Sequence, residues 1–211
     1  MTQSLLLLDS ASLYFRAFFG MKDDVRAPDG TPVNAVRGFL DFIARLVKDH
    51  DPAELVCCWD DDWRPDFRVA AIPSYKAHRV ADGTLGEKVP DELEAQVPII
   101  IELLAALGIA RIGVPGFEAD DVIGTLAMRA TRPVVIVTGD RDAFQLVDER
   151  VTVLYPKKGV SDLARMTPNA VEEKYGLTPA QYGSMIMLAM GIWFFVQRRN
   201  VPPLRTVAHL G

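Results

Sequence analysis

The fold is decided between residues 116 and 142, where two acidic motifs flank one apolar run. The chain reads Gly116-Phe117-Glu118-Ala119-Asp120-Asp121, then Val134-Val135-Ile136-Val137, then Thr138-Gly139-Asp140-Arg141-Asp142. The apolar run is continuous and β-branched, and a glycine turn ends it. Such runs are typical of parallel strands that are covered on both faces. We therefore predict an α/β fold with a mostly parallel central sheet and helices on both faces.

Five carboxylates surround this strand. Glu118, Asp120 and Asp121 open a helix predicted over the following residues, and Asp140 and Asp142 follow the carboxyl end of the strand. In open α/β sheets ligands bind at this edge, and hard divalent cations relieve the repulsion between crowded carboxylates. Alternatively, the first three residues only cap a helix and the last two only form a polar turn. Because the two motifs fall on adjacent elements, together they favour a metal site.

Two further apolar runs also end at an aspartate. Residues 5–8 lead to Asp9 and residues 55–59 lead to Asp60, so three predicted strands carry a carboxylate at the same position. Asp9 has two interpretations, and the residue alone does not decide between them. It is either the N-cap of a helix predicted over residues 12–19 or the first ligand of a metal site.

The composition excludes a membrane protein and predicts a cytoplasmic one. The chain has 211 residues, 49% of them hydrophobic, which suits one large domain or one domain with a small appendage. No run reaches the ~18 apolar residues of a membrane span, and the start lacks the charged region of a signal peptide. The net charge of −5 is weak evidence against a nucleic-acid partner, because metal ions would neutralise a carboxylate cluster. Cys57 and Cys58 lie in an apolar run, which predicts buried thiols.

Basic and aromatic side chains alternate after Asp60. Those that could contact DNA are Arg64, Arg68, Tyr75, Lys76 and Arg79. A solvated basic face is one explanation. Their position directly after an acidic strand end favours another, a segment that contacts the phosphates of a nucleic acid. Residues 81–89, which contain two glycines, are predicted to be mobile.

The rest of the chain alternates helical and strand patterns, as parallel sheets with crossover helices require. Asn34 is predicted to cap a helix that Asp51 ends. Residues 90–107 are predicted to form one helix with a kink at Pro98. The other predicted elements are strands over 112–114 and 151–155, a short helix after Asp142, and helices over 119–130, 167–176 and 180–190.

Five motifs together resemble those of a known family. They are Leu7-Leu8-Asp9-Ser10, Trp59-Asp60, Tyr75-Lys76-Ala77-His78-Arg79, Gly116-Phe117-Glu118-Ala119-Asp120-Asp121 and Thr138-Gly139-Asp140-Arg141-Asp142. In order and spacing they are similar to the 5′ nuclease (flap endonuclease) family, in its bacterial form related to the N-terminal 5′-3′ exonuclease domain of DNA polymerase I. The resemblance implies the PIN-like version of the α/β fold, with a carboxylate cluster at the carboxyl edge of the sheet.

The resemblance implies a nuclease that hydrolyses DNA phosphodiesters with two Mg²⁺ or Mn²⁺ ions. The expected metal-site residues are Asp9, Asp60, Glu118, Asp120, Asp121, Asp140 and Asp142. Asp9, Asp60 and Asp120 would bind one ion, and Asp140 with Asp142 the other. The remaining two carboxylates would act behind these ligands or hold metal-bound water. Two ions about 4 Å apart can activate a water molecule and stabilise the leaving oxygen.

The resemblance also implies how substrate is held. Lys76, Arg79 and Glu118 would assist the chemistry, the first two by neutralising charge that develops on the scissile phosphate. The expected partners are DNA with 5′ ends, flaps or branches, and RNA/DNA hybrids. The protein is expected to act as a monomer.

The carboxyl end departs from the family pattern. Residues 188–191 match it, but Ile192 and Phe195 stand where two further carboxylates are expected. We predict a catalytic domain over residues 1–191, with a flexible arch or clamp over about residues 64–98. Residues 192–211 form an atypical tail in place of a DNA-binding helix–hairpin motif, and we expect this tail to impair activity and to favour Mn²⁺.

Two other functions are consistent with parts of the sequence. A non-catalytic nucleic-acid-binding relative would keep the basic segment and lose the chemistry. A phosphatase of the aspartyl-phosphate type also places an aspartate after its first strand. That class usually needs a second aspartate two residues later, where this chain has Ala11, so it is the weaker alternative.

Overall fold

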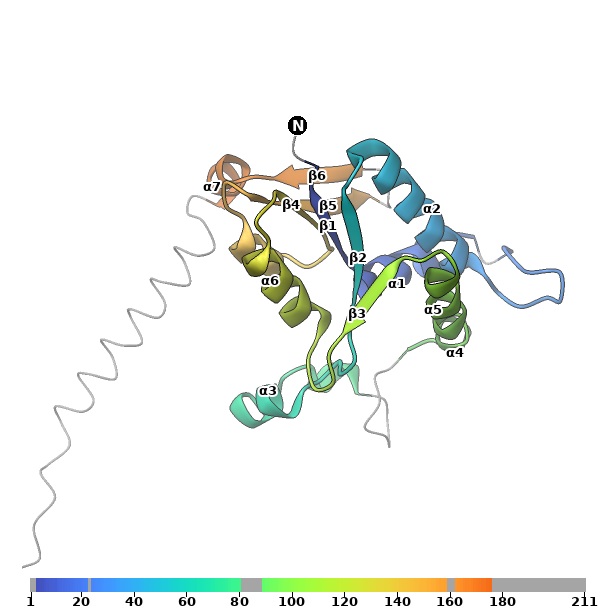
Figure 1. Cartoon of the computed structure of the whole chain (residues 1–211). Helices are drawn as coiled ribbons and strands as arrows, with labels where there is room; N and C mark the ends of the chain where they lie inside the picture. The colour runs from blue at the N-terminus through green and yellow to red at the C-terminus, as the bar shows by residue number, and fades with distance from the viewer. Residues whose placement is uncertain (1–2, 23, 81–88, 159–161, 176–211) are drawn as a thin grey trace, which may run out of the picture.

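Six strands form one sheet in the part of the chain that the structure describes, in the order β3-β2-β1-β4-β5-β6 (Figure 1). The structure is a computed structural model, and it describes residues 3–22, 24–80, 89–158 and 162–175. The strands are β1 Leu5–Asp9, β2 Glu54–Trp59, β3 Ala110–Gly113, β4 Val134–Val137, β5 Val151–Lys158 and β6 Asp162–Met166. All neighbouring pairs are parallel except β5 and β6. The predicted mostly parallel sheet is therefore confirmed.

The strand order reverses at β1, and this reversal decides where a ligand can bind. The chain leaves β1 for β2 on one side of it and returns to β4 on the other. The crossovers therefore diverge at the carboxyl ends of β1 and β4, and a crevice between diverging crossovers is the usual ligand site of such sheets. In the register, Leu8 pairs with Val137 and Val137 pairs with Leu154. Asp9 pairs with Cys58 at the end of β2.

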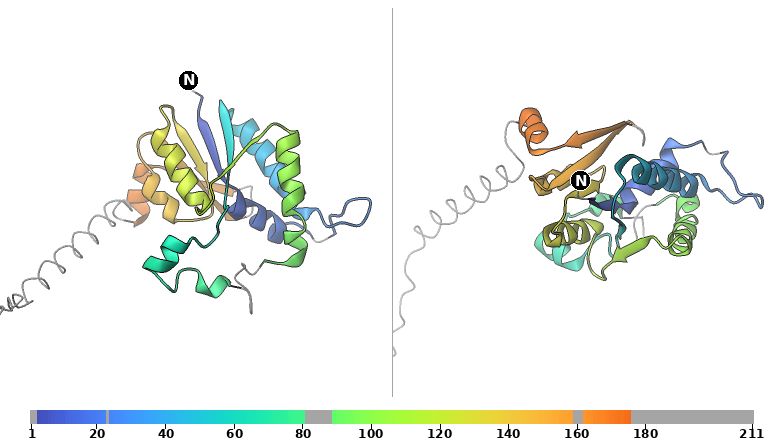
Figure 2. Two further views of the ribbon diagram at one scale, coloured as in Figure 1. Left: turned by 60° about the horizontal axis from the view of Figure 1, so that its bottom comes forward. Right: turned by 45° about the horizontal axis from the view of Figure 1, so that its top comes forward.

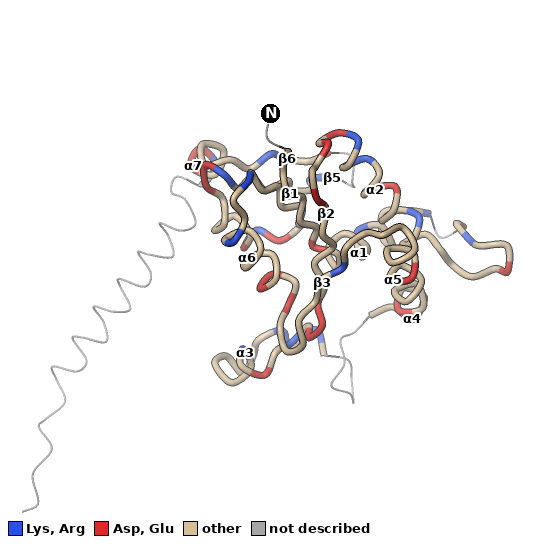
Figure 3. The backbone as a smooth tube through the Cα atoms, viewed as in Figure 1, with Lys and Arg blue, Asp and Glu red and all other residues tan. Residues whose placement is uncertain are grey.

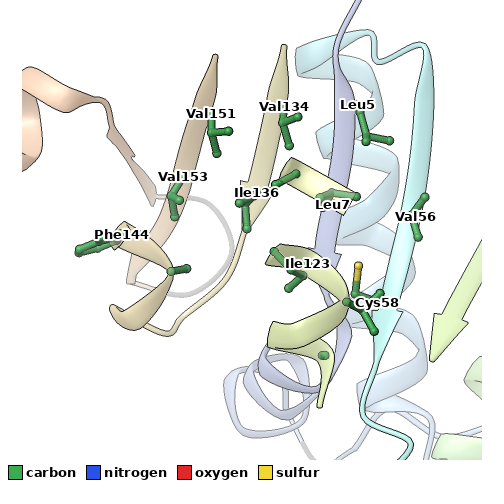
Figure 4. Packing of buried hydrophobic residues seen from close by; sticks show 14 of the residues in the cluster. Leu5, Leu7, Val56, Cys58, Ile123, Val134, Ile136, Phe144, Val151 and Val153 are labelled. Atoms are coloured by element: carbon green, nitrogen blue, oxygen red, sulfur yellow. The ribbon is translucent and has the colours of Figure 1, made fainter. Parts of the chain in front are cut away.

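Helices cover both faces of the sheet (Figure 2). The helices α1 (Ser10–Gly20), α2 (Asn34–His50) and α5 (Val97–Ala106) share one apolar cluster with alternate strand residues such as Leu6 and Leu8. The helix α6 (Ala119–Arg129) packs on the other face. Figure 4 shows Ile123 of α6 near Leu7, Ile136 and Cys58 in this second cluster. This alternation follows from the period of two in a strand, and it explains why the central strands β1 and β4 are apolar on both faces.

Several sequence predictions are confirmed with small shifts in their boundaries. The helix predicted over 12–19 begins at Ser10, directly after Asp9. Cys57 and Cys58 are buried free thiols. The predicted short helix after β4 is a 3₁₀ helix, η2 Asp142–Leu146, and the helix after residue 167 is α7 Pro168–Tyr175. Within the described residues, no helix combines the length and the apolar character needed to cross a bilayer.

Two local predictions are wrong, and one strand was not predicted. Residues 90–107 form two helices, α4 (Asp91–Glu94) and α5, because Pro98 lies in the first turn of the second helix, where it needs no hydrogen-bond partner. Asn34 is not a cap, since the N-cap of α2 is Val33. The β6 strand was not predicted, and it pairs antiparallel with a β5 that continues beyond Tyr155. The helix predicted over 180–190 and the tail from 192 lie outside the described residues, as do residues 81–88 of the stretch 81–89 that was predicted to be mobile.

Candidate active site at the carboxyl edge of the sheet

Four carboxylates line one cavity of about 760 Å³ at this edge of the sheet. We call them the carboxylate row: Asp9, Asp60, Asp120 and Asp140. Asp9 ends β1, Asp60 follows β2, Asp140 is the third residue after β4, and Asp120 lies in the first turn of α6. The expected meeting of three strand ends and one helix start is therefore present. The volume is in the range of small-molecule and substrate sites.

Asp9 is the most firmly held member of the row. It is 7% exposed, and its Oδ2 accepts a hydrogen bond of 2.5 Å from the Thr138 hydroxyl. Its Oδ1 accepts from the backbone N–H of Ser12 at 3.1 Å, as an N-cap does. Asp9 can thus be both the N-cap of α1 and a metal ligand. Capping uses one oxygen, and the carboxylate still lines the cavity.

Glycine at position 139 lets α1 approach the end of β4. A Cβ atom there would lie 2.8 Å from the Ser12 hydroxyl oxygen and 3.2 Å from a guanidinium nitrogen of Arg16. The Gly139 N–H instead donates to that hydroxyl at 2.9 Å. The next residue, Asp140, is tied to the same turn, because its N–H donates to Thr138 Oγ1 at 3.0 Å. The glycine of the predicted turn is needed for close approach.

Asp60 joins the end of β2 to the start of α6. Its Oδ1 accepts a hydrogen bond of 2.7 Å from the N–H of Ala119, the first residue of the helix. Asp120 follows directly, and it is exposed in the cavity lining. The helix start therefore brings Asp120 beside the strand ends, and its N-terminal dipole favours negative charge there.

Burial hinders the ionisation of three members of the row, and neighbouring carboxylates add to the effect. Burial raises the pKa of Asp9 to about 6, with smaller contributions from the charges of Asp60 and Asp140. Burial likewise raises the pKa of Asp60. The pKa of Asp120 is raised by its partial enclosure in the cavity and then by the charges of Asp9, Asp140 and Asp60. Crowded oxygen ligands that repel one another when ionised are what a hard divalent cation requires.

The carboxylate oxygens of the row are suitable ligands for a divalent metal ion, although they do not surround a single point as the ligands of a bound ion would. Among the described residues, no group of three His, Cys, Asp or Glu side chains is arranged to hold a metal ion. The fit therefore rests on four carboxylates that share one cavity and on the raised pKa values of three of them.

The other three predicted carboxylates do not line the cavity. Asp142 is exposed, and its N–H donates to Asp140 Oδ1 at 2.8 Å. Glu118 is 1% exposed and, with Asp121, forms a capping box at the start of α6. The expected convergence of seven carboxylates is thus seen for four of them. Neighbouring helix residues point about 100° apart, which is why Asp120 and Asp121 reach different surroundings.

Glu118 and Asp121 instead bind the basic segment. We call this group the clamp: Arg68, Tyr75, Lys76, Glu118 and Asp121. Lys76 Nζ lies 3.0 Å from Glu118 Oε1, and the Tyr75 hydroxyl donates to Glu118 Oε2 at 2.8 Å. Arg68 lies 2.6 Å from Asp121 Oδ1 and 3.6 Å from Glu118 Oε2. Figure 3 shows basic and acidic stretches interleaved between α3 (Asp66–Ala71) and the start of α6.

Some side chains of the basic segment bind other parts of the protein, and others line the cavity. Arg64 donates from Nε to the Tyr75 carbonyl at 2.7 Å, so it fixes the loop that follows α3. Lys76 has a φ of 48°, a left-handed backbone conformation that is uncommon for lysine. Lys76 and Arg79 line the cavity, whereas Arg64, Arg68 and Tyr75 do not. A simple solvated basic face does not describe this arrangement, because the carboxylates of α6 hold the segment in place.

Several residues of this site had no role predicted from the sequence. Thr138, Ser12, Arg141 and Tyr155 bind members of the row or line the same cavity. Tyr155 could have been found from its position, because it is the last residue of the predicted strand over 151–155. Ser12 could not, since its role depends on the turn at Gly139.

Comparison with known proteins settles the family. Residues 4–176 match the family described as "5′-3′ exonuclease, N-terminal resolvase-like domain". The chain belongs to this family. It is 62% identical over 189 residues to a 5′-3′ exonuclease of Streptomyces coelicolor, a match that covers 87% of this chain and 63% of that protein. It is 48% identical over 183 residues to DNA polymerase I of Mycobacterium tuberculosis, a match that covers 85% of this chain and 19% of the polymerase.

Solved structures share the fold. The T5 D15 protein co-crystallised with metal ions superimposes with a TM-score of 0.62 at 17% identity, over 82% of this chain and 61% of that one. A T5 D15 flap endonuclease complex with DNA and metal ions gives a TM-score of 0.59 at 17% identity, with the same coverage. The chain spans about three fifths of the length of these proteins and of the Streptomyces relative.

Proposed function

We propose that this protein is a divalent-metal-dependent 5′-3′ exonuclease and flap endonuclease that hydrolyses DNA phosphodiesters. The observation that carries the proposal is the carboxylate row, four acidic side chains in one cavity with Lys76 and Arg79 in its lining. Membership of the exonuclease family supports the same reaction. The T5 D15 structures contain metal ions, and one contains DNA, which supports the choice of cofactor and partner.

The chain's own residues would divide the work as follows. When bound, two Mg²⁺ or Mn²⁺ ions would supply an activated water and stabilise charge on the phosphate oxygens. Asp9, Asp60 and Asp120 would hold one ion, and Asp140 with Asp142 the other. Thr138 and Ser12 keep the strand ends together through their hydrogen bonds to Asp9 and Gly139. Asp9, Asp60 and Asp140 already accept hydrogen bonds from backbone N–H groups near adjacent strand ends, whereas Asp142 lies outside the cavity lining and would have to turn toward it.

Lys76 and Arg79 would orient the scissile phosphate over the row. A cation beside a phosphate in transfer stabilises charge that grows in the transition state. Glu118 and Asp121 would act through the clamp. Glu118 would hold Lys76 at the cavity, and Asp121 would hold Arg68 beside it. They are positioning residues in this proposal, and Tyr75 and Arg68 serve the same purpose.

The proposal includes where and on what the enzyme works. The substrates are DNA 5′ ends, flaps and branches, with RNA/DNA hybrids as a second class of substrate. We propose that the protein acts as a monomer in the cytoplasm. We propose residues 1–191 as the nuclease domain.

The test is cleavage of a 5′-labelled flap duplex and of a plain duplex, with Mg²⁺, with Mn²⁺ and with EDTA. We expect metal-dependent products from the wild type, and loss of these products in Asp120→Asn. The matched control is Asp41→Asn, an exposed aspartate of α2 that pairs with Arg37. Products that persist in EDTA or in Asp120→Asn would overturn the proposal.

Two other results would point to the alternatives. Tight DNA binding with no cleavage under any metal would indicate a non-catalytic nucleic-acid-binding relative. The absence of a closed three-ligand group among the described residues is the observation in favour of that alternative. Hydrolysis of p-nitrophenyl phosphate without DNA cleavage would revive the phosphatase.

A further inference from the structure

Arg141 and Tyr155 form a wall of the cavity that has no role in the proposed mechanism. The Arg141 guanidinium carbon lies 5.9 Å from the centre of the Tyr155 ring, within the range of a cation–π contact. Both residues line the same cavity as the carboxylate row. The Tyr155 ring also meets Phe144 edge to face, with centroids 5.6 Å apart, and Phe144 is 3% exposed. Tyr155 is therefore held by the core, while Arg141 is exposed.

The strand register places this wall level with the row. Leu8 pairs with Val137, and Val137 pairs with Leu154. The next residues of the three strands, Asp9, Thr138 and Tyr155, therefore lie at one level. Residues at one level of parallel strands point to the same face, and Thr138 and Asp9 confirm this by their hydrogen bond. Tyr155 packs against the apolar cluster on that face.

Cations therefore stand at both ends of the carboxylate row. Along the sheet edge the order is Asp60 after β2, Asp9 after β1, Asp140 after β4 and Tyr155 in β5. Lys76 and Arg79 line the cavity with Asp60, and Arg141 lies beside Tyr155. Strands are about 4.8 Å apart, so β2 and β5 are separated by roughly 14 Å. A nucleic-acid strand that lies along the whole row would pass Arg141 at the β5 end of the row.

The two ends differ in the groups that hold their cations. Lys76 lies 3.0 Å from the buried Glu118 carboxylate, which neutralises much of its charge. Arg141 lies over the face of the Tyr155 ring, and a ring face attracts a guanidinium and orients its plane. An arginine stacked on an aromatic ring is held in orientation and still presents N–H donors at its edge to phosphate oxygens.

We propose that Arg141, supported by Tyr155, binds a backbone phosphate of the DNA strand on the β5 side of the scissile phosphate. This inference rests on the proposed function for the identity of the scissile phosphate. Arg141 contributes affinity and places the strand, and Tyr155 is a positioning residue that acts through its ring. Neither is expected to change the chemical step.

The test measures binding of a fluorescent 5′-flap DNA by anisotropy in Ca²⁺ at several salt concentrations, together with single-turnover cleavage in Mg²⁺. The variants are Arg141→Gln, Tyr155→Leu, Tyr155→Phe and the double variant Arg141→Gln/Tyr155→Leu. The matched control is Arg129→Gln, at the exposed carboxyl end of α6. A helix rises 1.5 Å per residue, so Arg129 lies about 14 Å from the cavity end of α6. Melting temperatures establish that each variant is folded.

We expect Arg141→Gln to weaken binding about tenfold, as loss of a charge-assisted hydrogen bond does. The slope of log affinity against log salt should become shallower by about one, the signature of one lost phosphate contact. The maximal cleavage rate should change by less than about threefold. Tyr155→Leu should weaken binding in the same way, Tyr155→Phe should match the wild type, and the double variant should be no weaker than Arg141→Gln.

The inference and the proposed function fail in different ways. If the wild type binds and cleaves DNA but Arg141→Gln has the affinity and salt slope of Arg129→Gln, the inference is overturned and the nuclease stands. If the wild type binds without cleaving and the slope still falls in Arg141→Gln, the wall is a phosphate site and the nuclease function is overturned. A fall in cleavage rate with unchanged affinity would also overturn the inference, because it would place Arg141 in the chemistry.

Discussion

The carboxylate row and the clamp both contain acidic residues from the start of α6, but the surroundings of these residues differ. Those of the row lie near other carboxylates, and those of the clamp lie near cations. In the row, Asp9, Asp60 and Asp120 lie near other carboxylates, and their pKa values are raised. In the clamp, Glu118 is buried at hydrogen-bonding distance from Lys76 and Tyr75. Glu118 and Asp120 are nevertheless next-but-one neighbours in the chain. The row therefore holds carboxylates whose ionisation is opposed, whereas the clamp pairs its carboxylates with the cations of the basic segment.

The largest expected effect comes from Asp120→Asn, which should break the row and leave the clamp intact. We expect the single-turnover cleavage rate to fall about 1,000-fold, since a lost charge-stabilising group costs roughly 10²–10³ in rate. The melting temperature without metal should not fall, because the substitution removes repulsion between carboxylates. Single-turnover assays and thermal melts measure the two quantities. A clear fall in melting temperature would mean that Asp120 supports the fold and that the contrast is false.

Glu118→Gln should lower the stability of the protein, in contrast to Asp120→Asn. Arg68 and Lys76 would lose their buried counter-charge, and removal of one partner of a buried ion pair costs about 3–4 kcal/mol. For a chain of this size that corresponds to roughly 10 °C in melting temperature. Limited proteolysis should then cut within residues 64–80 before the rest of the domain. Asp41→Asn, which breaks an exposed pair with Arg37, is the control and should melt like the wild type.

The sequence predicted the row better than it predicted the clamp, for a physical reason. Asp9, Asp60 and Asp140 follow apolar runs, and parallel strands bring their carboxyl ends to one edge whatever else the chain does. Whether Glu118 and Asp121 face that edge depends on the rotation of α6 and on the docking of the basic segment. Both are tertiary contacts, between residues 53 positions apart for Arg68 with Asp121 and 42 for Lys76 with Glu118, and no local pattern encodes them.

The same distinction explains the errors in the fold. At the break between α4 and α5 lies Gln96, whose side-chain oxygen accepts from the N–H groups of Ala35 and Val36 at the start of α2. Gln96 thereby caps a helix that begins 62 positions earlier in the chain, so Asn34 does not need to cap it. Asn34 instead accepts a hydrogen bond from Gln96 and donates one to the Phe18 carbonyl. Long-range capping of this kind cannot be predicted from the capping residues alone.

Arg79→Ala and Lys76→Ala compare a cation that only lines the cavity with one that also belongs to the clamp. Arg79 lines the cavity but is not part of the clamp, whereas Lys76 belongs to both. We expect Arg79→Ala to slow single-turnover cleavage about 100-fold with little change in melting temperature or DNA affinity. Lys76→Ala should slow it similarly and also lower the melting temperature, because Glu118 loses a cation. Equal melting temperatures in the two variants would show that Lys76 does not stabilise the clamp.

The stability of the metal-free protein should depend on pH through Asp9. Its pKa is raised from 3.8 to about 6 in the folded state, so between about pH 4 and pH 6 the folded chain holds a proton that the unfolded chain has lost. Stability therefore falls as pH rises through this window, by about 2–3 kcal/mol, and is constant above it as far as Asp9 is concerned. Urea unfolding of the wild type and of Asp9→Asn in EDTA isolates this contribution as the difference between them. If the wild type instead gained stability relative to Asp9→Asn as pH rises through the window, the sign of this linkage would be wrong.

Tyr75→Phe should have the smallest effect, and it decides whether Tyr75 belongs to the clamp or touches DNA. The hydroxyl donates to the carboxylate of Glu118, and burial together with this carboxylate raises the pKa of Tyr75 to about 12, so the hydroxyl keeps its proton. Phenylalanine retains the ring beside Arg68 and Lys76 and removes one hydrogen bond to a charged partner. We expect a loss of about 1 kcal/mol in stability, no more than about a twofold change in DNA affinity, and an unchanged salt slope. In the background of Glu118→Gln the same substitution should cost less, because the charged acceptor is gone. A loss of affinity without a loss of stability would place the Tyr75 hydroxyl on the DNA, and the clamp would then have to be counted as part of the substrate site.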